Sequence, residues 1–154
     1  MTFKLPQSVL VVIHTVGGQV LMMERADARG YWQSVTGSRE GLEEPLWETA
    51  RREVEEETGL RATTENLQDW GEERTYEIFP RWRHRYAPGV TQNREHVFGL
   101  SLLQPEAVLL SPREHVAYAW LPWEEAQRRC FSWTNREAIE GLVRRCGWSE
   151  KPFG

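Results

Sequence analysis

The stretch from residue 37 to residue 60 constrains this chain more than any other, because it combines a predicted helix with a dense run of acidic side chains. It reads GSREGLEEPLWETARREVEEETGL. Seven of the chain's 23 acidic residues fall between Glu43 and Glu57. Pro45 suits the first turn of a helix, where its missing N–H costs nothing, and Gly59 is a typical C-terminal stop. The segment therefore predicts a loop, a helix and a stop.

Three glutamates crowd one face of the predicted helix: Glu53, Glu56 and Glu57 stand at i, i+3 and i+4, so their carboxylates share one side. Like charges at this spacing destabilise a helix by roughly 0.2–0.5 kcal/mol per pair. Arg52 is spaced to pair with Glu48 and Glu56, but one cation does not neutralise three carboxylates. A divalent cation such as Mg²⁺ would, because Mg²⁺ takes oxygen ligands and keeps water and phosphate in its shell. The alternative interpretation is a solvated acidic face without a ligand.

Residues 52–60, REVEEETGL, match the second half of the Nudix box, R-E-apolar-x-E-E-x-G-apolar. The chain therefore resembles the Nudix hydrolases, with the box at residues 37–60. The box places five residues between its glycine and its first glutamate, whereas six separate Gly37 from Glu44. We interpret this difference as a one-residue insertion in the loop before the helix. It leaves open whether Glu43 or Glu44 is the loop glutamate of the box.

Two segments outside the helix resemble one particular branch of the Nudix family. Residues 32–38 read WQSVTGS, with Thr36 where Nudix proteins usually have proline and Ser38 where a second glycine is usual. This segment is similar to the branch of the family that hydrolyses dihydroneopterin triphosphate, a precursor in bacterial folate synthesis. Residues 84–90, HRYAPGV, are similar to the same branch. With that match, residues 76–79 fall where the branch lines its pterin pocket.

The resemblance implies a metal-dependent hydrolase whose cofactor is Mg²⁺, with Mn²⁺ as an alternative. Glu53 and Glu57 are expected to be the principal metal ligands, and Glu56 and Glu114 to assist them. Arg52 is expected to orient these side chains, so the predicted catalytic set is Arg52, Glu53, Glu56 and Glu57. The general base is left open among the glutamates.

The same resemblance implies a set of substrate contacts. Lys4 and Arg25 are expected to pair with the triphosphate or with polar groups of the substrate. A carboxylate such as Glu77 suits a pterin ring, whose amino and ring N–H groups are adjacent donors. The predicted substrate-binding residues are Lys4, Arg25, Thr36, Tyr76, Glu77, Ile78, Phe79 and Ser132.

Some of these residues also have structural interpretations. Ser111 and Glu114 have the S-x-x-E spacing of a helix-capping box. Ser132 precedes a predicted helix and suits plain N-terminal capping as well as ligand binding. Residues 80–90 alternate arginine with aromatic or histidine side chains, which predicts an extended strand. That strand is either a charged sheet edge or a site for a polyanion.

The order of the predicted elements indicates the fold class. Strands are predicted at residues 8–16, 19–24, 61–64, 67–79, 95–103 and 118–121. Further helices are predicted at residues 122–129 and from the Thr134–Glu137 capping box to Gly147. This order predicts an α/β protein with a mixed sheet and helices packed on its faces. It agrees with the α/β/α sandwich and catalytic loop–helix–loop that the resemblance implies.

Length, charge and cysteine content limit the number of domains, the kinds of partner and the compartment. At 154 residues the chain is expected to form a single domain over residues 1–154. The net charge of −4 gives no argument for nucleic acid or an anionic membrane as partner, and no obligatory protein partner is inferred. Cys130 and Cys146 lack metal-site spacing and are interpreted as free thiols in a reducing cytoplasm, with one disulfide as the alternative.

The favoured function, implied by the resemblance, is hydrolysis of 7,8-dihydroneopterin triphosphate to dihydroneopterin monophosphate and pyrophosphate. One alternative is a Nudix pyrophosphohydrolase that acts on ordinary or oxidised nucleoside triphosphates. Another is a non-catalytic Nudix-fold binding module, against which the intact Glu53, Glu56 and Glu57 argue. A third alternative is that the acidic helix is only a charged structural element.

Overall fold

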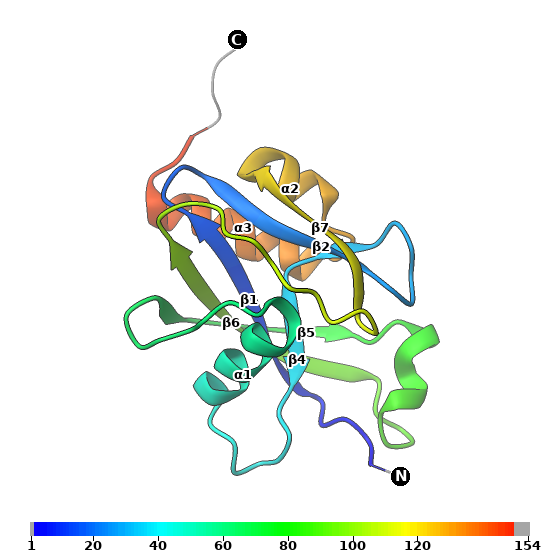
Figure 1. Cartoon of the computed structure of the whole chain (residues 1–154). Helices are drawn as coiled ribbons and strands as arrows, with labels where there is room; N and C mark the ends of the chain where they lie inside the picture. Colours follow the sequence, from blue (N-terminus) through cyan, green and yellow to red (C-terminus); the bar gives the residue numbers. More distant parts are fainter. Residues whose placement is uncertain (1, 150–154) are drawn as a thin grey trace.

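The computed structural model describes residues 2–149, and a mixed β-sheet runs through its centre (Figure 1). The strands are β1 (Gln7–Thr15), β2 (Gln19–Arg25), β3 (Trp32–Gln33), β4 (Val35–Ser38), β5 (Leu67–Glu77), β6 (Gln92–Leu102) and β7 (His115–Pro122). Their order is β3-β2-β1-β6-β5, while β4 pairs with β1 and β7 pairs with β2. β1 and β6 are parallel, and the other pairs are antiparallel. The predicted mixed sheet is confirmed.

Helices cover both faces of the sheet (Figure 1). They are α1 (Leu46–Thr58), α2 (Trp123–Arg129) and α3 (Trp133–Cys146). Alternate residues of β1 point to opposite faces, so Val9 packs in one core cluster with Val54 of α1, and Leu10 packs in the other with Ile139 of α3. Burial on both faces explains the unbroken apolar run in β1. Among residues 2–149, no helix has both the length and the apolar character needed to cross a lipid bilayer.

The ends of α1 follow the sequence prediction. Pro45 lies immediately before the first helical residue with a φ of −61°. Gly59 adopts the left-handed conformation with a φ of 71°, and its N–H donates to the carbonyl of Glu55 at 2.9 Å. Ala50 and Val54 are fully buried against the sheet. Glu53 and Glu57 are buried as well, whereas Glu55 and Glu56 are exposed.

Two segments predicted as strands have another structure. Residues 61–64 lead into a turn, in which the Asn66 side chain accepts a hydrogen bond from the Thr63 N–H at 2.7 Å. Such local side-chain bonds compete with strand pairing. The arginine- and aromatic-rich segment contains the 3₁₀ helix η1 (Pro80–Arg85) instead of an extended strand. Its first residue is proline, whose fixed φ suits a helical turn.

The C-terminal part of the chain corrects two further interpretations. α3 begins before the predicted capping box, because Ser132 is its N-cap and Ser132 Oγ accepts from the Asn135 N–H at 3.2 Å. Capping by Thr134 is therefore wrong, while the end of α3 at Gly147 is confirmed. Cys130 and Cys146 are both free thiols, so the disulfide alternative is also wrong.

Candidate active site

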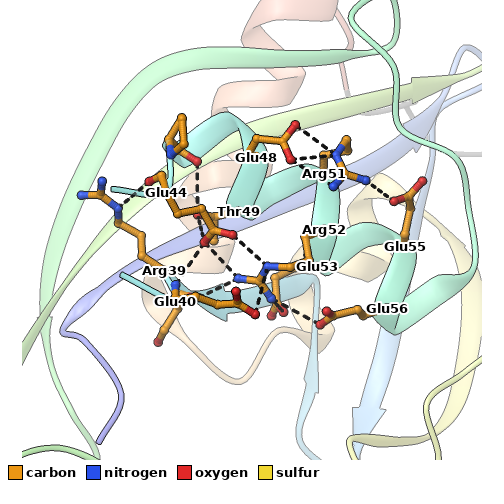
Figure 2. A network of polar contacts seen from close by, with 12 residues as sticks. Arg39, Glu40, Glu44, Glu48, Thr49, Arg51, Arg52, Glu53, Glu55 and Glu56 are labelled. Atoms are coloured by element: carbon orange, nitrogen blue, oxygen red, sulfur yellow. Dashed lines mark hydrogen bonds and ion pairs between the residues drawn. The ribbon is translucent and has the colours of Figure 1, made fainter. Parts of the chain in front are cut away.

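Arg52 ties together the acidic loop and helix (Figure 2). Its Nε and Nη2 donate to the two carboxylate oxygens of Glu44 at 3.0 and 3.1 Å, and its Nη1 donates to Glu53 Oε1 at 2.8 Å. Nη2 also donates to the carbonyl of Ser38 at 3.1 Å, which joins α1 to β4. Hydrogen bonding by the Arg52 guanidinium lowers the pKa of Glu44 to about 2. Glu44, rather than the exposed Glu43, is therefore the loop glutamate held at this site.

The remaining ion pairs of α1 correct one sequence prediction. Glu48 pairs with Arg51 at 3.0 Å instead of with Arg52. Arg51 also binds Glu55, one turn further on. Glu56 lies 3.4 Å from Arg52, as predicted, but its side chain is 54% exposed (Figure 2). Glu56 thus faces solvent on the outer side of the guanidinium.

Glu53 occupies space that only a glycine leaves open. A Cβ atom on Gly37 would lie 1.5 Å from Glu53 Oε2, so a side chain at residue 37 would displace the carboxylate. Only 8% of Glu53 is exposed. Burial, reinforced by the side chain of Glu56, raises the pKa of Glu53 to about 8. A cation beside this carboxylate would lower its pKa again and favour the charged form.

Glu57 and Glu114 meet in an acidic cavity that Glu53 also lines. Ligand atoms of Glu57, Glu114 and His115 all lie within 4.8 Å of one another. Glu57 is 1% exposed, and among the described residues neither of its carboxylate oxygens has a hydrogen-bond partner. Burial and the charges of Glu53 and Glu114 raise the pKa of Glu57 well above its usual range. Orphaned, buried carboxylate oxygens beside a second carboxylate fit a hard divalent cation.

Glu114 reaches this cavity from a turn. The N–H groups of Glu114 and His115 both donate to the carbonyl of Ser111 at 3.0 Å. β7 begins at His115, so a strand and not a helix follows the turn. The capping-box interpretation of Ser111 and Glu114 is therefore wrong. The Glu114 carboxylate instead adds to the acidic cavity.

The His115 ring is oriented by the side chains behind it. Arg25 Nη1 donates to Gln33 Oε1 at 3.2 Å, which directs Gln33 Nε2 to His115 Nε2 at 3.1 Å. Because an amide nitrogen is a donor, His115 Nε2 accepts and the ring proton lies on Nδ1. His115 Nδ1 is 3.8 Å from Glu57 Oε1. Burial lowers the pKa of His115 to about 4, so the ring is neutral, and among the described residues its Nδ1 has no hydrogen-bond partner.

A second cavity, here called the aromatic cavity, shares lining residues with the acidic one, and all eight residues predicted to bind substrate line it. Its aromatic side chains are Tyr76, Phe79, Trp82, Tyr86, Phe131 and Trp133. Phe79 stacks on Trp82 with ring centroids 5.3 Å apart. Phe131 contacts both rings edge-on, at 5.8 and 5.9 Å. The Trp82 indole N–H donates a hydrogen bond to Asp27 Oδ2 at 3.0 Å. These rings form a packed aromatic cluster on one side of the cavity, against which an aromatic ligand could lie.

Basic residues form the boundary between the two cavities. Lys4, Arg25 and Arg85 line both the acidic and the aromatic cavity, as does Thr36. Burial lowers the pKa of Lys4. Arg25 is fixed by Asp27, with donor–acceptor distances of 2.8 and 2.9 Å. A ligand with a ring at one end and phosphates at the other would pass these cations.

Sequence reasoning missed several lining residues. Arg85 and Trp82 belong to the segment suggested as a polyanion site, but the strand prediction put them on opposite faces, whereas both line the aromatic cavity. Phe131 had no motif to single it out. Glu95 of β6 is 3% exposed and lines the aromatic cavity, whereas the predicted pterin contact, Glu77, is 76% exposed on the rim. Alternation along a strand carries no signal for a buried carboxylate of this kind.

Comparison with known proteins gives consistent results. The family model for the NUDIX domain matches residues 4–142. A dihydroneopterin triphosphate diphosphatase of Escherichia coli K12 is 44% identical over 145 residues, covering 92% of this chain and 94% of the relative. Its namesake from Haemophilus influenzae is 40% identical over 143 residues, covering 91% and 89%. The solved structure of the E. coli dihydroneopterin triphosphate pyrophosphohydrolase matches with a TM-score of 0.86 at 42% identity, covering 94% of this chain and 99% of that one.

Proposed function

This chain belongs to the NUDIX family, and from that premise we propose that it hydrolyses 7,8-dihydroneopterin triphosphate to dihydroneopterin monophosphate and pyrophosphate, with Mg²⁺ as cofactor. Relatives that are 40–44% identical over most of their length carry the name of this activity. The whole of residues 1–154 is taken as one catalytic domain, working in the cytoplasm, where its free thiols stay reduced.

The main structural observation in support of this substrate is the arrangement of the two cavities. The acidic cavity and the aromatic cavity share a boundary of cations, Lys4, Arg25 and Arg85. A pterin triphosphate has the matching order of parts, because its flat ring and its phosphates are joined by a short polar chain. The ring would lie against Phe79 and Trp82, and the phosphates would lie beside the basic residues.

The residues of the acidic cavity suit phosphoanhydride hydrolysis. We propose that Glu53, Glu57 and Glu114 hold the cation, while Arg52 keeps Glu53 in place at 2.8 Å. The bound cation would screen phosphate charge and lower the pKa of the attacking water. Glu56, the fourth predicted ligand, is assigned an assisting part through Arg52.

The reaction needs a proton acceptor and charge stabilisation from the protein. Water forms the new P–O bond, the anhydride bond breaks, and pyrophosphate leaves. The proton of the water passes to one of the carboxylates of the acidic cavity. Lys4 and Arg85, which line the acidic cavity, would offset the negative charge of the phosphate chain. His115 lies beside Glu57, with its Nδ1 3.8 Å from Glu57 Oε1.

The test is a panel of substrates. Pyrophosphate release with Mg²⁺ is measured for dihydroneopterin triphosphate, the ordinary nucleoside triphosphates and an oxidised guanine nucleotide. The proposal predicts the highest kcat/KM for the pterin. A nucleotide preferred a hundredfold would overturn the pterin assignment. Binding of the pterin without turnover, in Mg²⁺ or in Mn²⁺, would instead support a non-catalytic module.

A further inference from the structure

We propose that Glu95 selects the ring of the substrate by accepting the two adjacent N–H donors, the 2-amino group and N3–H, of a 2-amino-4-oxopyrimidine edge. This inference rests on the proposed function, because it assumes that the aromatic cavity takes the ring. It replaces the exposed Glu77 with a buried carboxylate as the group that recognises the pterin.

Glu95 lies in the middle of the sheet, at the wall of the aromatic cavity. In β6 it pairs with Ser8 of β1 on one side and with Arg74 of β5 on the other. Its side chain lines the cavity although only 3% of the residue is exposed. Within residues 2–149, Glu95 Oε1 is buried and has no hydrogen-bond partner.

Burying an unpartnered carboxylate in this position costs folding free energy, unless a ligand donates hydrogen bonds to it. Burial raises the pKa of Glu95 to about 7, even though the Thr134 hydroxyl and the Arg74 charge act in the opposite direction. A carboxylate with a purely structural role would have its oxygens satisfied by the surrounding protein. Glu95 keeps an open acceptor where the cavity receives its ligand.

Glu77 is a poorer candidate for the same task. Its side chain is 76% exposed, and its nearest cation, Arg83, lies 3.9 Å away. In water a carboxylate discriminates weakly, because solvent competes for each hydrogen bond. A desolvated acceptor such as Glu95 discriminates strongly, because a ligand without matching donors leaves it unpaired.

The aromatic rings restrict how a ligand ring can approach Glu95. Phe79 and Trp82 stack on each other, and Phe131 contacts both of them edge-on. A flat ring that lies against this cluster keeps its edge available to a carboxylate. Two parallel N–H groups on that edge match the two oxygens of a carboxylate, as in bidentate pairing.

The direct test compares two free bases, pterin and lumazine, by calorimetric titration of the metal-free protein. Lumazine has a carbonyl where pterin has its 2-amino group, so it presents an acceptor to Glu95. Wild-type protein is expected to bind pterin at least about tenfold more tightly than lumazine. Equal binding of the two bases, or no measurable binding of pterin, would overturn the proposal without reference to any variant.

Three variants refine the test. E95Q is expected to lose the preference for pterin, because the amide brings a donor of its own to the N–H edge. E73Q is the matched control, since Glu73 is exposed on neighbouring β5 and pairs with Arg94 at 3.3 Å; it should bind as wild type does. Loss of the preference in E77Q with its retention in E95Q would contradict the assignment.

Turnover of dihydroneopterin triphosphate separates this inference from the proposed function. E95Q is expected to raise KM at least about tenfold with a smaller change in kcat. If wild-type protein turns the substrate over but E95Q has an unchanged KM, Glu95 is not the selecting group. If the protein prefers pterin to lumazine but releases no pyrophosphate, the role of Glu95 in ring selection is supported and the proposed function is contradicted.

Discussion

Replacing Gly37 with alanine tests how closely β4 and α1 must approach for Glu53 to work. The added Cβ atom would lie 1.5 Å from Glu53 Oε2, 2.0 Å from its Cδ and 2.4 Å from its Cγ. Ordinary contact requires about 3.5 Å. The Glu53 carboxylate must therefore shift by roughly 2 Å, the difference between these distances. Gly37 pairs with Val9 of β1, so the backbone cannot easily give way instead.

The expected effect on catalysis is large. A displacement of about 1 Å at a reacting group already costs about a hundredfold in rate, so G37A should lower kcat for Mg²⁺-dependent pyrophosphate release at least about a hundredfold. Overpacking should also lower the free energy of unfolding by about 1–3 kcal/mol. The two effects are measured by steady-state kinetics and by urea unfolding of the same preparation.

The control is Gly41, in the loop that joins β4 to α1. An alanine Cβ at Gly41 meets no atom within 4 Å, so G41A should keep its activity within about twofold and its stability within about 0.5 kcal/mol. A folded G37A protein with activity within threefold of wild type would refute the reasoning. It would mean that the position of Glu53 in this structure is not the one that matters for catalysis.

Three other perturbations have defined outcomes. R52K should lower the free energy of unfolding by about 1–3 kcal/mol, because lysine cannot reproduce the two hydrogen bonds to Glu44. An unchanged urea-unfolding curve would contradict this. Mg²⁺ at a hundred times its Kd should stabilise wild-type protein by about 2.7 kcal/mol, and thermal unfolding of E57Q should show much less of this gain. Burial lowers the pKa of His14 from 6.5 to about 4, so the unfolded chain takes up the proton first as the pH falls. Stability should then be lost between pH 6.5 and 4, by about 2 kcal/mol at pH 5, and urea unfolding of H14L should show a flatter pH profile.

The acidic helix was predictable because its signals are local. Pro45, Gly59 and the spacing of the glutamates all lie within one short segment, and the matching motif is dense. All eight predicted substrate contacts line the aromatic cavity, although other residues that line it were missed. These positions came from family resemblance, which carries tertiary information that periodicity lacks.

The parts that were wrong or missed depend on contacts distant in sequence. The 3₁₀ helix at residues 80–85 is held where the Trp82 indole reaches Asp27, 55 positions away. Alternating side chains in that segment suited a strand equally well. Glu95 is buried only because β6 lies between two other strands and α3 closes over it, near Thr134. Neither arrangement can be read from the neighbouring residues.

The central claim is that Glu53, Glu57 and Glu114 hold a divalent cation against the phosphates of the substrate. Anomalous diffraction from crystals soaked in Mn²⁺ measures this directly. We expect an anomalous peak bonded to carboxylate oxygen atoms of Glu53, Glu57 and Glu114. Well-ordered crystals without a peak in the acidic cavity, at Mn²⁺ concentrations that support turnover, would contradict it.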